Sequence, residues 1–163
     1  MYKRQFKRGI STPIKDLNER DCDAILKEHR PDVYYDVLIK CWQFDYSLTD
    51  NGPHLGTHTD MIRSVCEHDN MKPVVQECRK RIKELLQQQD IVRVACVDDR
   101  GIHRSVAVAT ILQAVCKMKG YSSKGPIHME RRRWKQGKWC RECKHCRHND
   151  SKDCLYRAVA EYW

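Results

Sequence analysis

The sequence contains no apolar run approaching the roughly twenty residues that a membrane-spanning helix needs. It also contains no internal repeat and no low-complexity tract, which argues against a solenoid or a fibrous protein. The amino-terminal residues 1–13 are basic but lack the apolar stretch of a secretory signal. These absences predict an intracellular protein, cytoplasmic or nuclear, with no membrane contact.

The composition is that of a globular protein. The chain has 163 residues, of which 40% are hydrophobic and 33% charged, enough for one ordinary domain with a small appendage. Its formal net charge of +9 suits a polyanionic partner, such as RNA, DNA or a phosphorylated metabolite.

Local patterns predict alternating strands and helices. Strands are expected in three segments rich in β-branched, aromatic or other apolar residues: 33–44, 91–97 and 127–134. Amphipathic periodicity predicts a helix from Asn70, and a mostly apolar helix follows Ser105 and ends at Gly120. This order is typical of an α/β fold with a mainly parallel sheet flanked by helices.

The two ends of the chain have weaker signals. The first thirty residues predict one or two short helices, since Pro13 and Asp21 suit first-turn and capping positions. Residues 155–163 predict a short terminal helix.

The loop between the second strand and the apolar helix is a candidate anion site. Loops at the carboxyl ends of strands bind ligands in open α/β sheets, and a helix start offers free N–H groups and a positive dipole. The candidate ligand-binding residues here are Cys96, Arg100, Gly101, His103, Arg104 and Ser105. A plain turn with Ser105 as the helix cap is the alternative.

Three residues of this loop leave an enzymatic reading open. Asp98 and Asp99 would repel a phosphate unless they are paired, or they could hold a cation such as Mg²⁺. Cys96 could be a nucleophile with a lowered pKa, although more residues separate it from Arg104 than the cysteine-dependent phosphatases allow. A cysteine at a strand end is also commonly a small buried hydrophobe.

Residues 55–86, residues 94–121 and the basic segment 128–134 together resemble the C-terminal domain of the RapZ family of RNase adapter proteins. The sharpest element is the loop that ends in His-Arg-Ser. The resemblance implies an α/β phosphate-binding domain over residues 1–134, RNA contact and possible homo-oligomers. It also adds His58 and Arg63 to the expected ligand-binding residues.

The chain has ten cysteines, and those near its carboxyl end have the spacing of a metal site. Closely spaced Cys-x-x-Cys steps suit tetrahedral zinc, and an iron–sulfur cluster is the weaker alternative. The predicted zinc ligands are Cys140, Cys143, Cys146 and Cys154, with His145 or His148 as an alternative ligand. The sequence thus predicts a zinc-binding unit over residues 135–163.

Basic and aromatic residues precede the cysteines. Cations can contact a nucleic-acid backbone, and indole rings can stack on bases. The candidate nucleic-acid-binding residues are Arg131, Arg132, Arg133, Trp134, Lys135 and Lys138. Packing of the tryptophans against the main domain explains them equally well.

Three functions are therefore open. The first is a phosphate-recognising binding module, for RNA or a phosphorylated metabolite, with structural zinc. The second is a phosphoesterase or phosphotransferase that uses Cys96, or a metal held by Asp98 and Asp99. The third is a protein-interaction adaptor.

Overall fold

A computed structural model describes residues 2–5, 24, 34–44, 55–98, 103–128 and 152–163. The strands are β1 (Tyr2–Gln5), β2 (Val37–Lys40), β3 (Val94–Asp98) and β4 (Ile127–His128). The helices are α2 (Thr59–Glu67), α3 (Met71–Leu85), α4 (Arg104–Met118), α7 (Lys152–Ala160) and the short 3-10 helix η2 (Cys41–Gln43).

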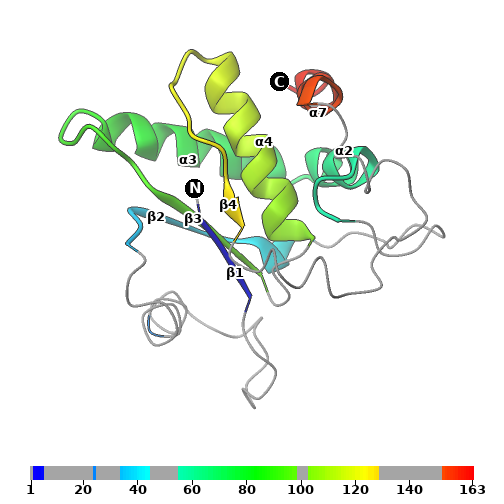
Figure 1. Ribbon diagram of the computed structural model, residues 1–163, viewed down its shortest axis with the longest axis horizontal. Helices are drawn as coiled ribbons and strands as arrows, with labels where there is room; N and C mark the ends of the chain where they lie inside the picture. The colour runs from blue at the N-terminus through cyan, green and yellow to red at the C-terminus, as the bar shows by residue number, and fades with distance from the viewer. Residues whose placement is uncertain (1, 6–23, 25–33, 45–54, 99–102, 129–151) are drawn as a thin grey trace.

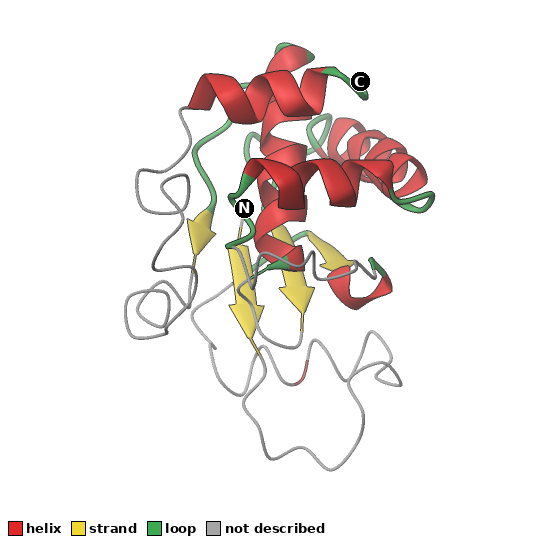
Figure 2. Ribbon diagram, turned by 90° about the vertical axis from the view of Figure 1, so that its right-hand side faces the viewer, coloured by secondary structure: helices red, strands yellow, loops and turns green. Residues whose placement is uncertain are grey.

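The four strands form one parallel sheet in the order β2-β3-β1-β4. Because every described pair is parallel, all four strands end at the same edge of the sheet (Figure 2). The predicted α/β class with a parallel sheet is confirmed. β3 is buried along its whole length, as expected for a central apolar strand.

The described helices gather on one side of the sheet (Figure 1). The main core lies between them and one face of the strands, where Ile39 and Cys96 meet the buried residues of all four α-helices. α4 is buried on most of its faces, as its apolar sequence predicts. The helix ends where predicted: Gly120 follows the C-cap with φ +81°, a conformation that costs glycine little.

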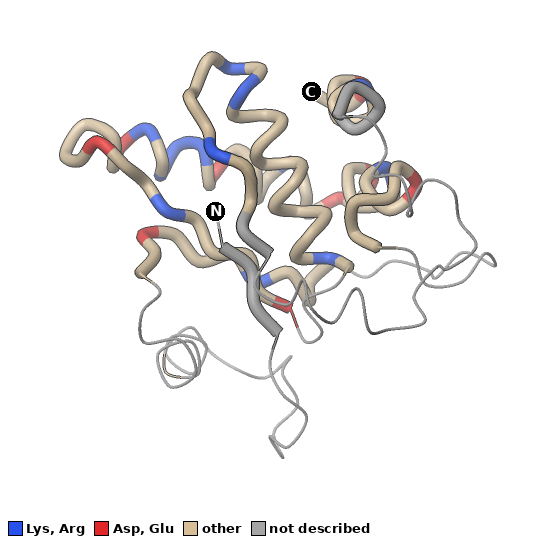
Figure 3. Tube along the Cα trace, in the orientation of Figure 1, with Lys and Arg blue, Asp and Glu red and all other residues tan. Residues whose placement is uncertain are grey.

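The predicted amphipathic helix after Asn70 is α3. Val75, Cys78 and Ile82 are buried, whereas lysine and arginine residues, blue along the tube in Figure 3, occupy several of the other positions of this helix. Asn70 holds the N-cap position, but its side chain makes no capping hydrogen bond. Apolar spacing rather than the cap therefore determines where this helix packs.

Two elements of the structure were not predicted. Tyr2–Gln5 is a strand that pairs with β3 on one side and β4 on the other, and the helices expected from Pro13 and Asp21 lie outside the described residues. The segment around Asp60 is helix α2, and its apolar residues Met61, Ile62, Val65 and Cys66 lie on the buried face. Tertiary pairing and packing outweigh local propensity in both cases.

The boundaries of two other elements differ from the expected ones. The first expected strand is shorter, since β2 ends at Lys40 and η2 follows. The terminal helix forms as expected but begins earlier, at Lys152.

An ion pair and a hydrogen bond join α2 to the residues that directly follow α7. Arg63 Nε lies 3.5 Å from Glu161 Oε2, and the Tyr162 hydroxyl donates to Glu67 Oε1 at 2.7 Å. The hydrogen bond to Glu67 raises the pKa of Tyr162 to about 12, so Tyr162 remains a donor throughout the neutral range.

None of the helices in the described segments is long and apolar enough to cross a membrane.

Candidate functional site

The candidate anion loop lies at the carboxyl edge of the sheet, between the end of β3 and the start of α4. β3 ends at Asp98 and α4 begins at Arg104. The described part of the site therefore consists of the end of this strand and the start of this helix. Asp99, Arg100 and Gly101 lie outside the described residues.

Asp98 closes the start of α4. Its side chain is 1% exposed, and Oδ2 accepts a hydrogen bond of 2.8 Å from the Ser105 N–H. A carboxylate here satisfies one of the helix's unpaired N–H groups and interacts favourably with the positive end of its dipole. The cap position itself belongs to His103, whose side chain makes no capping bond, so Ser105 is not the helix cap.

Arg104 joins the start of α4 to the end of β2. Its Nη1 donates to the Trp42 carbonyl oxygen at 3.1 Å, and Trp42 belongs to η2, which directly follows β2. The guanidinium therefore lies at the carboxyl edge, close to where two neighbouring strands end. A guanidinium group carries five N–H donors in a planar arrangement that suits phosphate oxygens.

Ser105 and His103 are enclosed. Ser105 is 0% exposed, and its hydroxyl has no hydrogen-bond partner among the described residues. His103 is also buried. A buried hydroxyl without a partner costs about 1–3 kcal/mol, so the Ser105 oxygen is a ready donor or acceptor for a group supplied from outside the described chain.

Cys96 lies on β3, two residues before Asp98, and is 0% exposed. It faces Cys41, which is equally buried and within hydrogen-bonding reach of it. Burial raises the pKa of the Cys41 thiol well above its usual range, and the neighbouring Cys96 and Asp98 raise it further. Both sulfurs are parts of the core rather than of a solvent-facing surface.

Gly56 and His58 bring the chain before α2 against the same helix turn. A Cβ at position 56 would overlap the His103 carbonyl oxygen and would stand 2.9 Å from the Ala107 nitrogen, so only glycine fits. His58, 6% exposed, caps α2 by accepting a hydrogen bond of 3.2 Å from the Asp60 N–H at Nδ1. His58 therefore lies two residues from the backbone that contacts α4.

Arg63 occupies a different surface. It lies on α2 and pairs with Glu161, which follows α7. The described contacts thus tie Arg63 to the carboxyl-terminal helix rather than to the start of α4.

The predicted zinc and nucleic-acid residues lie almost entirely outside the described part of the chain. Only Cys154 is included, as a backbone position within α7. In the segments that the structure does describe, no group of three or more histidine, cysteine or acidic side chains could hold a metal ion. The five cysteines whose side chains the structure describes, Cys41, Cys66, Cys78, Cys96 and Cys116, are buried and form no disulfide.

Sequence reasoning missed Gly56, Cys41 and the Trp42 carbonyl as neighbours of this site. Cys41 and Trp42 reach it because β2 lies beside β3, and Gly56 because its segment packs on α4. Gly56 precedes α2 by three residues, but its need to be glycine comes from the approach of α4, which no local pattern shows.

Comparison of the chain with protein-family models, with curated proteins and with solved structures found no match.

Proposed function

We propose that this chain is a phosphate-recognising binding module whose ligand is RNA or a phosphorylated metabolite. The observation that carries the proposal is the buried, unpartnered Ser105 hydroxyl in the first turn of α4, beside Arg104. A helix start at the carboxyl edge of a parallel sheet is a favourable place for an anion. The loop of His103, Arg104 and Ser105, which resembles the RapZ family, supports the same ligand class.

Asp98 sets the charge balance of the proposed site. Its carboxylate already occupies the Ser105 N–H and offsets part of the helix dipole. A phosphate must therefore draw its stabilisation from the Arg104 guanidinium and from donors such as the Ser105 hydroxyl. This balance favours moderate affinity for inorganic phosphate.

Removing only the charge of Asp98 tests this balance. Asparagine can still accept the Ser105 N–H bond, so Asp98→Asn should keep the fold and bind inorganic phosphate about tenfold more tightly, since a nearby negative charge is lost. Isothermal titration calorimetry measures the change, with the exposed Asp90→Asn as the matched control. A binding loss in Asp98→Asn would instead indicate a metal-held phosphate and would refute the proposed charge balance.

No described contact favours the enzymatic alternative. A cysteine nucleophile must meet its substrate as a thiolate, whereas the Cys96 thiol belongs to the main hydrophobic core and lies within hydrogen-bonding reach of the buried Cys41 thiol. Asp98 caps a helix, a structural role that accounts for its burial.

The proposal includes a structural zinc ion held by Cys140, Cys143, Cys146 and Cys154. The place of Cys154 within α7 supports it, because α7 buries Ala158 and Val159 in the main core. A metal with one ligand on α7 would join the cysteine segment to the rest of the fold. A segment this short cannot build a core of its own without such a link.

Metal analysis tests the zinc site. Purified protein should hold about one zinc per chain, and Cys143→Ser should lose most of it because a tetrahedral thiolate site needs all four ligands. Cys116→Ala removes a buried core thiol and should retain the metal. Wild-type zinc below about half an equivalent, or equal loss in both variants, would contradict a zinc site at these cysteines.

A further inference from the structure

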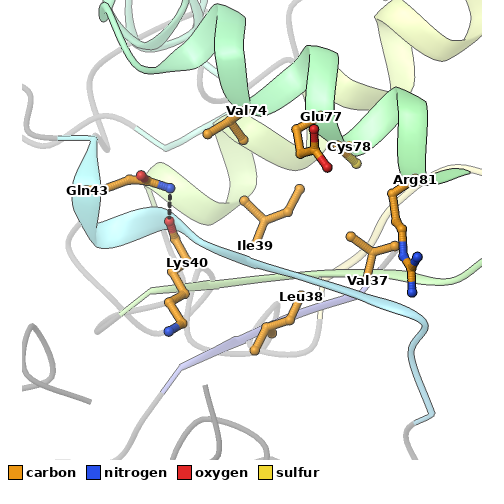
Figure 4. A pocket seen from close by; sticks show the side chains of 9 residues that line it. All are labelled: Val37, Leu38, Ile39, Lys40, Gln43, Val74, Glu77, Cys78 and Arg81. Carbon is orange, nitrogen blue, oxygen red and sulfur yellow. Dashed lines mark hydrogen bonds between the residues drawn. The ribbon is translucent and has the colours of Figure 1, made fainter. Parts of the chain in front are cut away.

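A shallow hollow of about 320 Å³ lies between β2 and α3, along the outer strand of the described sheet (Figure 4). Its floor is apolar, with Val37 and Ile39 from the strand and Val74 from the helix. Glu77 and Arg81 flank it, one helical turn apart on α3. This surface is separate from the proposed anion site.

The outer edge of β2 presents backbone groups with which a further strand could pair. Val37 N–H donates to the Arg93 carbonyl of the neighbouring chain segment at 3.2 Å. Since alternate residues of a strand face opposite neighbours, Leu38 and Lys40 direct their N–H and C=O groups away from β3. Within the part of the chain that the structure describes, β2 has a strand on one side only.

Two backbone groups at the ends of β2 already have hydrogen-bond partners within the chain. Gln43 Nε2 donates to the Lys40 carbonyl at 2.7 Å, and the Asp36 N–H donates to the Arg93 carbonyl at 2.8 Å. A strand pairing at this edge should therefore leave those two groups out. The Leu38 N–H, the Leu38 C=O and the Lys40 N–H point outward for it.

We propose that this edge pairs with the same edge of a second copy, with antiparallel β2 strands related by a two-fold axis at Leu38. In that register, the two Leu38 residues exchange both of their backbone hydrogen bonds. Position 36 of one copy then lies opposite position 40 of the other. A regular ladder would also join the Asp36 N–H to the Lys40 carbonyl of the second copy. That bond is not needed here, because the Asp36 N–H is directed to the Arg93 carbonyl and the Lys40 carbonyl accepts from Gln43.

The charges are self-complementary about the same axis. Asp36 lies opposite Lys40 of the second copy, which is a favourable cross-strand arrangement. In Figure 4, Arg81 lies over Val37, and Glu77 lies toward Ile39. A two-fold axis between these positions sets Glu77 against Arg81 of the second copy twice, as an isologous interface requires.

Asp36 carries its charge in this arrangement. Burial opposes ionisation, but the hydrogen bonds from the Arg93 N–H, Gln89 and Tyr34 outweigh it and lower the pKa of Asp36. The carboxylate is thus ionised at neutral pH and can attract Lys40 across the interface.

Charge reversal tests the proposed interface in the full chain, independently of phosphate binding. Sedimentation equilibrium should show a dimer, and Glu77→Arg or Arg81→Glu should raise its dissociation constant at least about tenfold, because like charges then face each other. The combined swap restores opposite charges and should return the constant to within about threefold of the wild type. Lys83→Glu makes the same charge change on an exposed α3 residue outside the hollow and should have little effect.

Three outcomes would overturn the proposal. A wild-type chain that is monomeric at all accessible concentrations would refute the proposed dimer. A dimer indifferent to both single reversals would use another surface. A double swap no tighter than the single variants would contradict the pairing of Glu77 with Arg81.

Discussion

Replacing Arg104 with alanine should weaken the binding of inorganic phosphate by roughly ten- to a hundredfold, the range for losing a charge-assisted hydrogen bond. Arg104 is the described cation in the first turn of α4, and its bond to the Trp42 carbonyl holds it at the carboxyl edge of the sheet. Titration calorimetry gives the two affinities directly.

Two comparisons make the Arg104 result specific. Arg157→Ala removes an exposed arginine on α7 and should change affinity less than about twofold, as expected for a screened charge. Arg104→Lys keeps the charge but loses the planar donor geometry, so its affinity should lie between those of the wild type and Arg104→Ala. Equal losses in Arg104→Ala and Arg157→Ala would show that net charge, rather than this site, binds phosphate.

Replacing Gly56 with alanine should destabilise the fold by about 1–3 kcal/mol, the usual cost of overpacking. The added Cβ would meet the His103 carbonyl, the Val106 side chain and the Ala107 nitrogen, and two of these three are backbone atoms of a buried helix turn. Either α4 or the segment before α2 must move, which would also disturb the proposed anion site.

Gly125 offers a matched control for Gly56. A Cβ at Gly125 would have its nearest neighbour, Gln113 Nε2, at 3.8 Å, so Gly125→Ala should be nearly neutral. Urea denaturation at constant m compares the two variants through their midpoints. Equal midpoints would contradict the close approach of Gly56 to α4.

The sequence predicted those parts of the fold that carry a strong local pattern. The apolar spacing of Val75, Cys78 and Ile82 predicted α3, and Gly120 correctly marked the end of α4. β3 was predicted from its continuous apolar run, because a buried parallel strand is apolar on both faces. The order of these elements also predicted the carboxyl edge, where β3 ends at Asp98 and α4 begins at Arg104.

Other parts depend on contacts that no local pattern encodes. Tyr2–Gln5 has a polar sequence, yet it forms a strand because β3 and β4 pair with it on both sides. From the sequence, Asp98 was expected to bind a metal or to repel a phosphate. In the structure its carboxylate accepts the Ser105 N–H, seven residues later, and so caps the start of α4. The contact between Arg104 and Trp42 joins positions 62 residues apart, and only the strand order brings them together.

The most direct test of the proposed anion site is an amide NMR titration of ¹⁵N-labelled protein with inorganic phosphate. We expect saturable shifts concentrated in the first turn of α4, at Arg104, Ser105 and Val106, with smaller changes at Gly56, which contacts that turn. In Asp98→Asn the same resonances should shift at lower phosphate concentration. Shifts confined to the exposed lysines and arginines of α3, or the absence of saturation at the start of α4, would contradict a phosphate site there.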